Sequence, residues 1–171
     1  MSKRDAAKSL VISMLYVLPR HQVEGRKRLQ KLAYLSGCGV QDETVSSYRL
    51  HFFGPYSKDV AIATDDLVFS GELTEKLASI SNSDSLQFCY ELTSNATKPT
   101  SKTTKRLQPL LEQLDHFTTV ELEVASTVAY HLTRGESYET AVAKTKEMKP
   151  NRAVLPVLRK AEAILETIGL R

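Results

Sequence analysis

Apolar residues recur with a helical period in three segments of the first half of the chain. These segments are residues 5–18, 25–37 and 57–70, and each ends at or next to a proline or a glycine. Residues three and four apart share one side of a helix, so each segment can bury its apolar side against a common core. Proline and glycine commonly end helices. The pattern therefore predicts three amphipathic helices.

The period changes to alternation in the segments that lie between and after these helices. Residues 48–53 alternate as on a half-buried strand, and the Gly-Pro pair that follows is expected to turn the chain. Residues 73–80 and 85–92 flank the polar stretch SNSD and predict a β-hairpin. The order of helix, helix, strand, helix and hairpin predicts a winged-helix-like unit.

The second half of the chain is predicted to be helical after a basic connection. Residues 93–106 have no hydrophobic period and carry four cations without an acid, which indicates a long loop or linker. Four further segments have helical periodicity, and Thr118 and Ser137 are expected to cap two of them. We therefore predict an α+β, mostly helical protein with a winged-helix-like unit in residues 1–92, the basic loop, and a helical part in residues 107–171 packed on the first unit.

Composition and cysteine content favour a cytoplasmic protein that does not enter a membrane. The chain has 171 residues, and its 42% apolar and 25% charged residues are usual for a soluble globular protein. No apolar run approaches the roughly 18 residues of a membrane span, and the charged start with its short apolar run is interpreted as a helix rather than a signal peptide. Cys38 and Cys89 lack the spacing of a zinc site and are expected to be reduced thiols.

Local catalytic and metal-binding motifs are absent from the sequence. There is no GxSxG nucleophile elbow and no glycine-rich phosphate loop, and the four histidines have no partner four residues away. Glu121 and Glu123 are expected on the solvated first turn of a helix. We therefore expect no metal and no cofactor and favour a non-enzymatic protein. An enzyme whose site is assembled from distant residues stays an alternative, with Arg49, His51 and Tyr56 as its candidate cluster.

Positive charge is concentrated in two segments, although the net charge of the chain is only +3. Residues 20–31 hold five cations against Glu24 alone, and residues 98–106 hold four cations against no acid. The rest of the chain is therefore acidic. Such segregation exceeds what a mixed soluble surface requires, and it indicates a basic functional face.

The positive charge on the predicted exposed side of the second helix has two interpretations. On a helical wheel Lys27, Lys31 and Tyr34 lie together, opposite the leucines, and are predicted to be exposed. Ammonium groups beside an aromatic ring suit a nucleic-acid backbone, but any soluble helix also needs a polar face. If the protein binds nucleic acid, its phosphate contacts are expected from Arg26, Lys27, Lys31, Lys58, Lys98, Lys102, Lys105 and Arg106.

The order of several short motifs resembles the YwgA-like family and, more loosely, the Panacea antitoxin domain. GRKRLQKLAYL precedes an aromatic strand ending in HFFGPYSKDV, DDLVFSGEL follows, and KEMKP lies before the final helix. The resemblance covers residues 25–75 strongly and residues 118–168 weakly. The matching positions are Gly25, Leu29, Gln30, Lys31, Leu32, Tyr34, Leu35, Gly54, Pro55, Tyr56, Ser57, Asp66, Leu67, Gly71 and Leu73.

The resemblance implies a winged-helix-like α/β domain with a helical C-terminal part and no established enzymatic activity. Members are similar to small prokaryotic proteins found among toxin–antitoxin or defence genes, which implies a protein or nucleic-acid partner rather than a metabolite. Most matching positions have structural roles, such as a helix cap at Ser57. The positions that look free to contact a partner are Gln30, Lys31, Tyr34 and Tyr56.

A non-enzymatic binding module, acting as an antitoxin-like or regulatory adaptor for a protein partner, is the preferred hypothesis. Nucleic-acid binding is the second. A helix-turn-helix that reads the major groove needs two helices joined by a tight turn, whereas residues 57–70 are predicted as one uninterrupted helix after a strand. The main partner is therefore predicted to be a protein, and homo-oligomerisation is left open.

Overall fold

The described residues form an α+β, mostly helical protein, as predicted. The computed structural model describes residues 2–79 and 86–171. Its α-helices are α1 Lys3–Val17, α2 Arg26–Val40, α3 Lys58–Phe69, α4 Ser101–Leu114, α5 Thr119–Leu132, α6 Tyr138–Met148 and α7 Leu155–Thr167. Its strands are β1 Gln22–Glu24, β2 Arg49–His51, β3 Gly54–Tyr56, β4 Leu73–Ser79 and β5 Leu86–Leu92.

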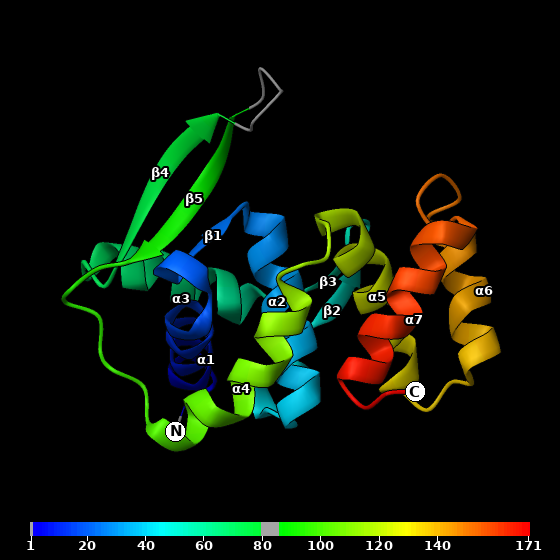
Figure 1. Cartoon of the computed structure of the whole chain (residues 1–171), viewed down its shortest axis with the longest axis horizontal. Coiled ribbons are helices and arrows are strands. Elements are labelled where there is room, and N and C mark those ends of the chain that lie inside the picture. The colour runs from blue at the N-terminus through cyan, green and yellow to red at the C-terminus, as the bar shows by residue number, and fades with distance from the viewer. Residues whose placement is uncertain (1, 80–85) are drawn as a thin grey trace.

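The first part of the chain contains an antiparallel sheet of three strands. Strands β4 and β5 pair as the predicted antiparallel hairpin, whose turn lies outside the described residues, and β1 adds to β5 to give the strand order β1-β5-β4. The hairpin extends away from the helices (Figure 1). Strand β1 was not predicted, because three residues are too few to display an alternating pattern.

A second, smaller hairpin is inserted between α2 and α3. Strand β2 pairs with β3, so that Arg49 lies opposite Tyr56 and His51 lies opposite Gly54. The prediction of a single strand over residues 48–53 with a turn at Gly54-Pro55 is therefore wrong. The turn precedes Gly54, which has φ of 87° and approaches α5 so closely that a Cβ atom would lie 2.9 Å from Thr127 Oγ1.

The basic connection is partly helical, which corrects the prediction of a loop over residues 93–106. Helix α4 begins at Ser101, and the Thr100 side chain accepts a hydrogen bond from the Thr103 N–H. The first turns of α4 are polar and solvent-exposed, so they gave no hydrophobic period. The predicted caps at Ser57, Thr118 and Ser137 are confirmed.

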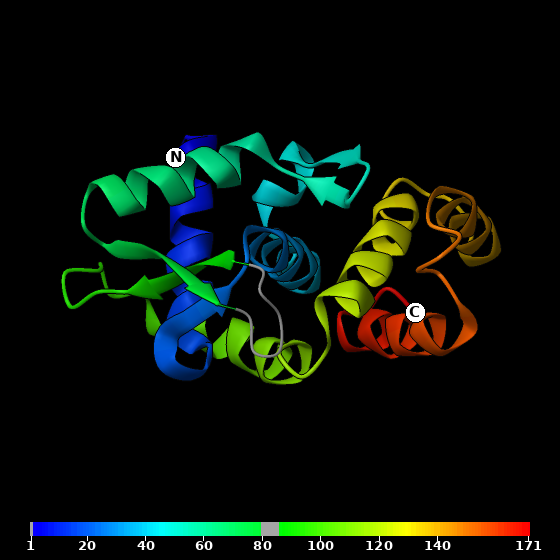
Figure 2. The ribbon, with the colours of Figure 1, turned by 90° about the horizontal axis from the view of Figure 1, so that it is seen from above.

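Helix α2 lies at the centre of the molecule. It packs against α1 on the side of the sheet, against α4, and against α5 on the side of the C-terminal helices (Figure 2). One hydrophobic cluster joins residues from all of these helices, including the fully buried Tyr34 of α2, and it also contains the fully buried Tyr48, which precedes β2. Because α2 is covered on both of these sides, several of its polar residues are buried, whereas those of an ordinary surface helix face water.

Candidate functional site

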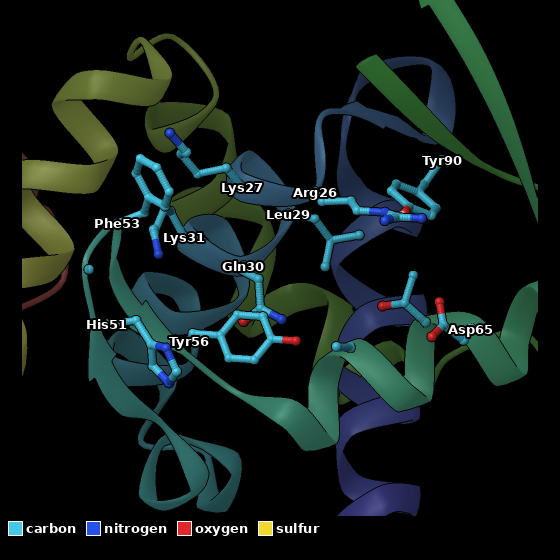
Figure 3. A pocket seen from close by; sticks show the side chains of 13 residues that line it. Arg26, Lys27, Leu29, Gln30, Lys31, His51, Phe53, Tyr56, Asp65 and Tyr90 are labelled. Carbon is cyan, nitrogen blue, oxygen red and sulfur yellow. Dashed lines mark hydrogen bonds between the residues drawn. The ribbon is translucent and has the colours of Figure 1, made fainter. Parts of the chain in front are cut away.

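A cavity of about 390 Å³ opens where α2, the β2–β3 hairpin, α3 and β5 meet. Lys27 and Lys31 line it from α2, Phe53 and Tyr56 line it from the hairpin, and Asp65 lines it from α3 (Figure 3). This volume lies within the usual range of ligand pockets. The cavity combines aromatic walls with cationic groups and is the candidate functional site.

Three of the four predicted partner-contacting residues are buried, which corrects the prediction that they are exposed. Gln30 and Lys31 are 5% and 2% exposed, and Tyr34 has no exposed surface. The Tyr34 ring packs on Tyr48 with ring centroids 4.7 Å apart, and its hydroxyl lies 3.2 Å from Thr133 Oγ1. Only Tyr56 is exposed. The helical wheel placed Lys31 and Tyr34 opposite the leucines but could not indicate that other elements cover that side of α2 too.

Gln30 attaches the β2–β3 hairpin and the start of α3 to α2. Its side-chain amide donates to the Ser57 carbonyl, and its side-chain oxygen accepts from the Ser57 N–H, both at 3.0 Å. The Ser57 hydroxyl in turn accepts from the Val60 N–H at 3.2 Å. Gln30 therefore holds one wall of the cavity in place.

Replacing Gln30 by Leu is expected to lower the free energy of unfolding by about 1–3 kcal/mol, because the buried Ser57 N–H loses its partner. Urea unfolding of the variant measures the loss. Gln108→Leu is the control, because the Gln108 side chain is exposed on α4. Equal stabilities of the two variants would contradict the assigned role.

Lys31 places a buried ammonium group at the cavity. Its Nζ donates to the Pro55 carbonyl at 2.6 Å. Burial lowers the pKa of Lys31 from 10.5 to about 7, and the neighbouring Glu123 carboxylate opposes this shift only in part. With a pKa of about 7, Lys31 is only partly charged near neutral pH.

Behind the cavity, Glu123 is the centre of a buried ionic cluster that was not predicted. Its carboxylate is 1% exposed, lies 2.7 Å from Lys149 Nζ and 3.5 Å from Lys27 Nζ, and also pairs with Arg152. Lys149 additionally donates to the Phe52 carbonyl at 2.7 Å, which connects the cluster to the hairpin. The expectation that Glu123 lies on a solvated face is therefore wrong, whereas Glu121 forms the predicted capping box. No local signal could have joined residues so far apart in sequence.

The cations that begin α2 are bound to partners within the protein. Arg26 donates to the Tyr90 hydroxyl at 2.9 Å and to Glu75 at 3.2 Å, and its guanidinium stacks on Phe88. Lys27 lies over the Phe53 ring, 3.9 Å from its centroid, in addition to its contact with Glu123. Together with the burial of Lys31, these contacts remove most of the basic face predicted for this helix.

The two basic segments lie at opposite ends of α2. Arg106 donates to the Val40 carbonyl at the C-terminal end of the helix, where a cation stabilises the helix dipole. Arg26 lies at the other end, and 15 helical residues span roughly 22 Å. The remaining predicted phosphate contacts, Lys58, Lys98, Lys102 and Lys105, are exposed. The segments therefore do not form one compact phosphate-binding patch.

The residues of the enzyme alternative are only partly brought together. His51 and Tyr56 both line the cavity, and their rings pack edge to face with centroids 5.2 Å apart. Arg49 instead donates to the carbonyls of Ser46 and Tyr48. Within residues 2–79 and 86–171, no group of three His, Cys, Asp or Glu side chains could hold a metal ion.

Comparison with protein-family models and with curated proteins finds no match for this chain. No helix in the described part of the chain combines the length and apolar character that a membrane crossing requires.

Proposed function

We propose that this protein is a non-enzymatic binding module, an antitoxin-like or regulatory adaptor, that holds a protein partner at the β2–β3 hairpin and the cavity beside it. The supporting observation is the exposure of aromatic side chains on this hairpin. Phe52, Phe53 and Tyr56 are 76%, 46% and 38% exposed. We call these three side chains the hairpin surface.

Exposed aromatic residues around a cavity are typical of protein-binding surfaces. Aromatic side chains dominate interface energies when they are desolvated, and residues that insert into pockets contribute most. The β2–β3 hairpin that carries this surface is also held in place, because Lys149 and Lys31 donate to the carbonyls of Phe52 and Pro55, and Gln30 donates to that of the adjacent Ser57. A rigid surface binds with a smaller entropic cost.

Nucleic-acid binding is less well supported as an alternative. Arg26, Lys27 and Arg28 of α2 are paired internally and Lys31 is buried, whereas Arg106 of α4 lies at the other end of α2. On helix α3, Asp66 is paired with Arg4 and Lys8, but Asp59 and Asp65 make no ion pair among the described residues. These acids would repel phosphates.

Copurification from the native host tests the proposal. Wild type, a Phe53→Ala/Tyr56→Ala variant and a Phe69→Ala control are tagged and purified with and without nuclease. Phe69 is 95% exposed at the end of α3 and does not line the cavity. We expect wild type and the control to retain a stoichiometric protein after nuclease treatment. The double variant is expected to retain about tenfold less of that protein than wild type does.

Thermal unfolding of each variant establishes that it is folded. Copurification of nucleic acid that elutes with salt, without a protein, would favour the alternative. Equal retention of a partner by all three proteins would contradict the hairpin surface as the binding site.

A further inference from the structure

The ammonium group of Lys31 has donors to spare inside the cavity. An ammonium carries three N–H donors, and within the described residues Lys31 makes one hydrogen bond, to the Pro55 carbonyl. Its side chain is almost completely buried, so bulk water cannot freely satisfy the others. A buried donor without a partner is costly, and a ligand that accepts from it is stabilised accordingly.

Among the described residues, Lys31 also has no carboxylate that serves it alone as an ion-pair partner. Glu123 is the acid whose charge raises the pKa of Lys31, but Lys27, Lys149 and Arg152 already share that carboxylate. No ion pair joins Lys31 to an acid in the part of the chain that the structure describes. The surroundings of Lys31 therefore hold more positive than negative charge.

The remaining cations of the cavity limit the kind of anion that fits. Arg26 and Lys27 also line it, but each is already paired with a glutamate. One unpaired ammonium with free donors matches a single negative charge, as on a carboxylate, better than the double charge of a phosphate. Leu29, Phe53 and Tyr56 add apolar surface around it.

We propose that the cavity binds the carboxylate of an acidic residue of the protein partner, flanked by an apolar side chain, with Lys31 as its counter-ion. This inference rests on the proposed function and names the chemistry that the partner presents. The carboxylate accepts from the free Lys31 donors, and the flanking side chain packs on Phe53 and Tyr56. Both of these aromatic residues line the same cavity as Lys31 (Figure 3). Asp65, on the α3 side of the cavity, disfavours a second acid there.

An NMR titration of the ¹⁵N-labelled protein at pH 6 tests this inference. The probes are acetyl-Leu-Glu-Leu-amide, its uncharged counterpart acetyl-Leu-Gln-Leu-amide, and inorganic phosphate. We expect the Glu peptide to give saturable shifts at the amides of Lys31 and Tyr56 and to bind about tenfold more tightly than the Gln peptide. In Lys31→Met the two peptides are expected to bind alike.

The comparison of the two peptides uses the wild-type protein, so it is valid even if the Lys31→Met variant does not fold. Equal affinities for the Glu and Gln peptides, no saturable binding of the Glu peptide, or tighter binding of phosphate would overturn the inference. The copurification experiment separates this failure from that of the proposed function. A partner lost by Phe53→Ala/Tyr56→Ala but retained by Lys31→Met would leave the proposed function standing without the carboxylate.

Discussion

Glu123→Gln is expected to lower the free energy of unfolding by about 3–5 kcal/mol, the loss typical of breaking a buried ion pair by removing one partner. The Glu123 and Lys149 side chains are 1% and 3% exposed. Without the carboxylate charge, Lys149 and Arg152 are left as an uncompensated positive pair. Their contacts join α5, the segment after α6, and the β2–β3 hairpin. The substitution is therefore expected to lower the stability of the whole fold and not only of one element.

Urea unfolding measures this loss, and a constant m-value would show that the unfolded state is unchanged. Glu147→Gln is the matched control, because the Glu147 side chain is exposed and its replacement should change stability by less than about 0.5 kcal/mol. Adding Lys149→Met to Glu123→Gln is expected to restore part of the loss, since it removes the unpaired charge. A loss below about 1 kcal/mol would contradict a buried cluster.

The second large effect is a pH-dependent stability that Lys31 contributes. Burial lowers the pKa of Lys31 in the folded protein to about 7, whereas its ordinary value is 10.5. Below pH 7 the amine is charged in both states, and the cost of the buried charge is fully present. As the pH rises from 7 to 10.5, only the unfolded state keeps the proton, so this cost is relieved and stability rises.

Comparison with Lys31→Met isolates this contribution. The stability of wild type minus that of the variant is expected to increase by about 1 kcal/mol for each pH unit above 7, and to be level below it. The charged groups that face Lys31 are Lys27, Glu123 and Lys149, and both proteins contain them. Lys102→Met is the control, because Lys102 is exposed on α4. A difference that does not change with pH would show that Lys31 is not buried as a titrating amine.

The helices and the long hairpin could be predicted because their signals are local. The apolar period of residues 5–18 and the alternation of residues 85–92 each lie within one element, and α1 and β5 follow them closely. The caps at Thr118 and Ser137 depend on residues three positions apart. Strands β2 and β3 were predicted poorly, since three-residue strands depend on pairing and on the contact of Gly54 with α5.

The candidate site could be predicted only in part. Tyr56 was correctly placed at the surface, and Lys31 lines the cavity, although from a buried position. The helical wheel predicted exposure for Lys31 because it assumes that polar residues face water. Pro55, which accepts from Lys31, lies 24 residues away, and Thr133, next to the Tyr34 hydroxyl, lies 99 residues away.

The sequence by itself therefore determined most of the helices and the long hairpin, because hydrophobic period, caps and breakers act over a few residues. The tertiary structure alone decided which polar groups are buried, that four cations gather near Glu123, and that a cavity forms beside the hairpin. These features depend on α2 being covered by both α5 and the β2–β3 hairpin. Burial and charge pairing follow from contacts between distant segments, and no local pattern specifies which segments meet.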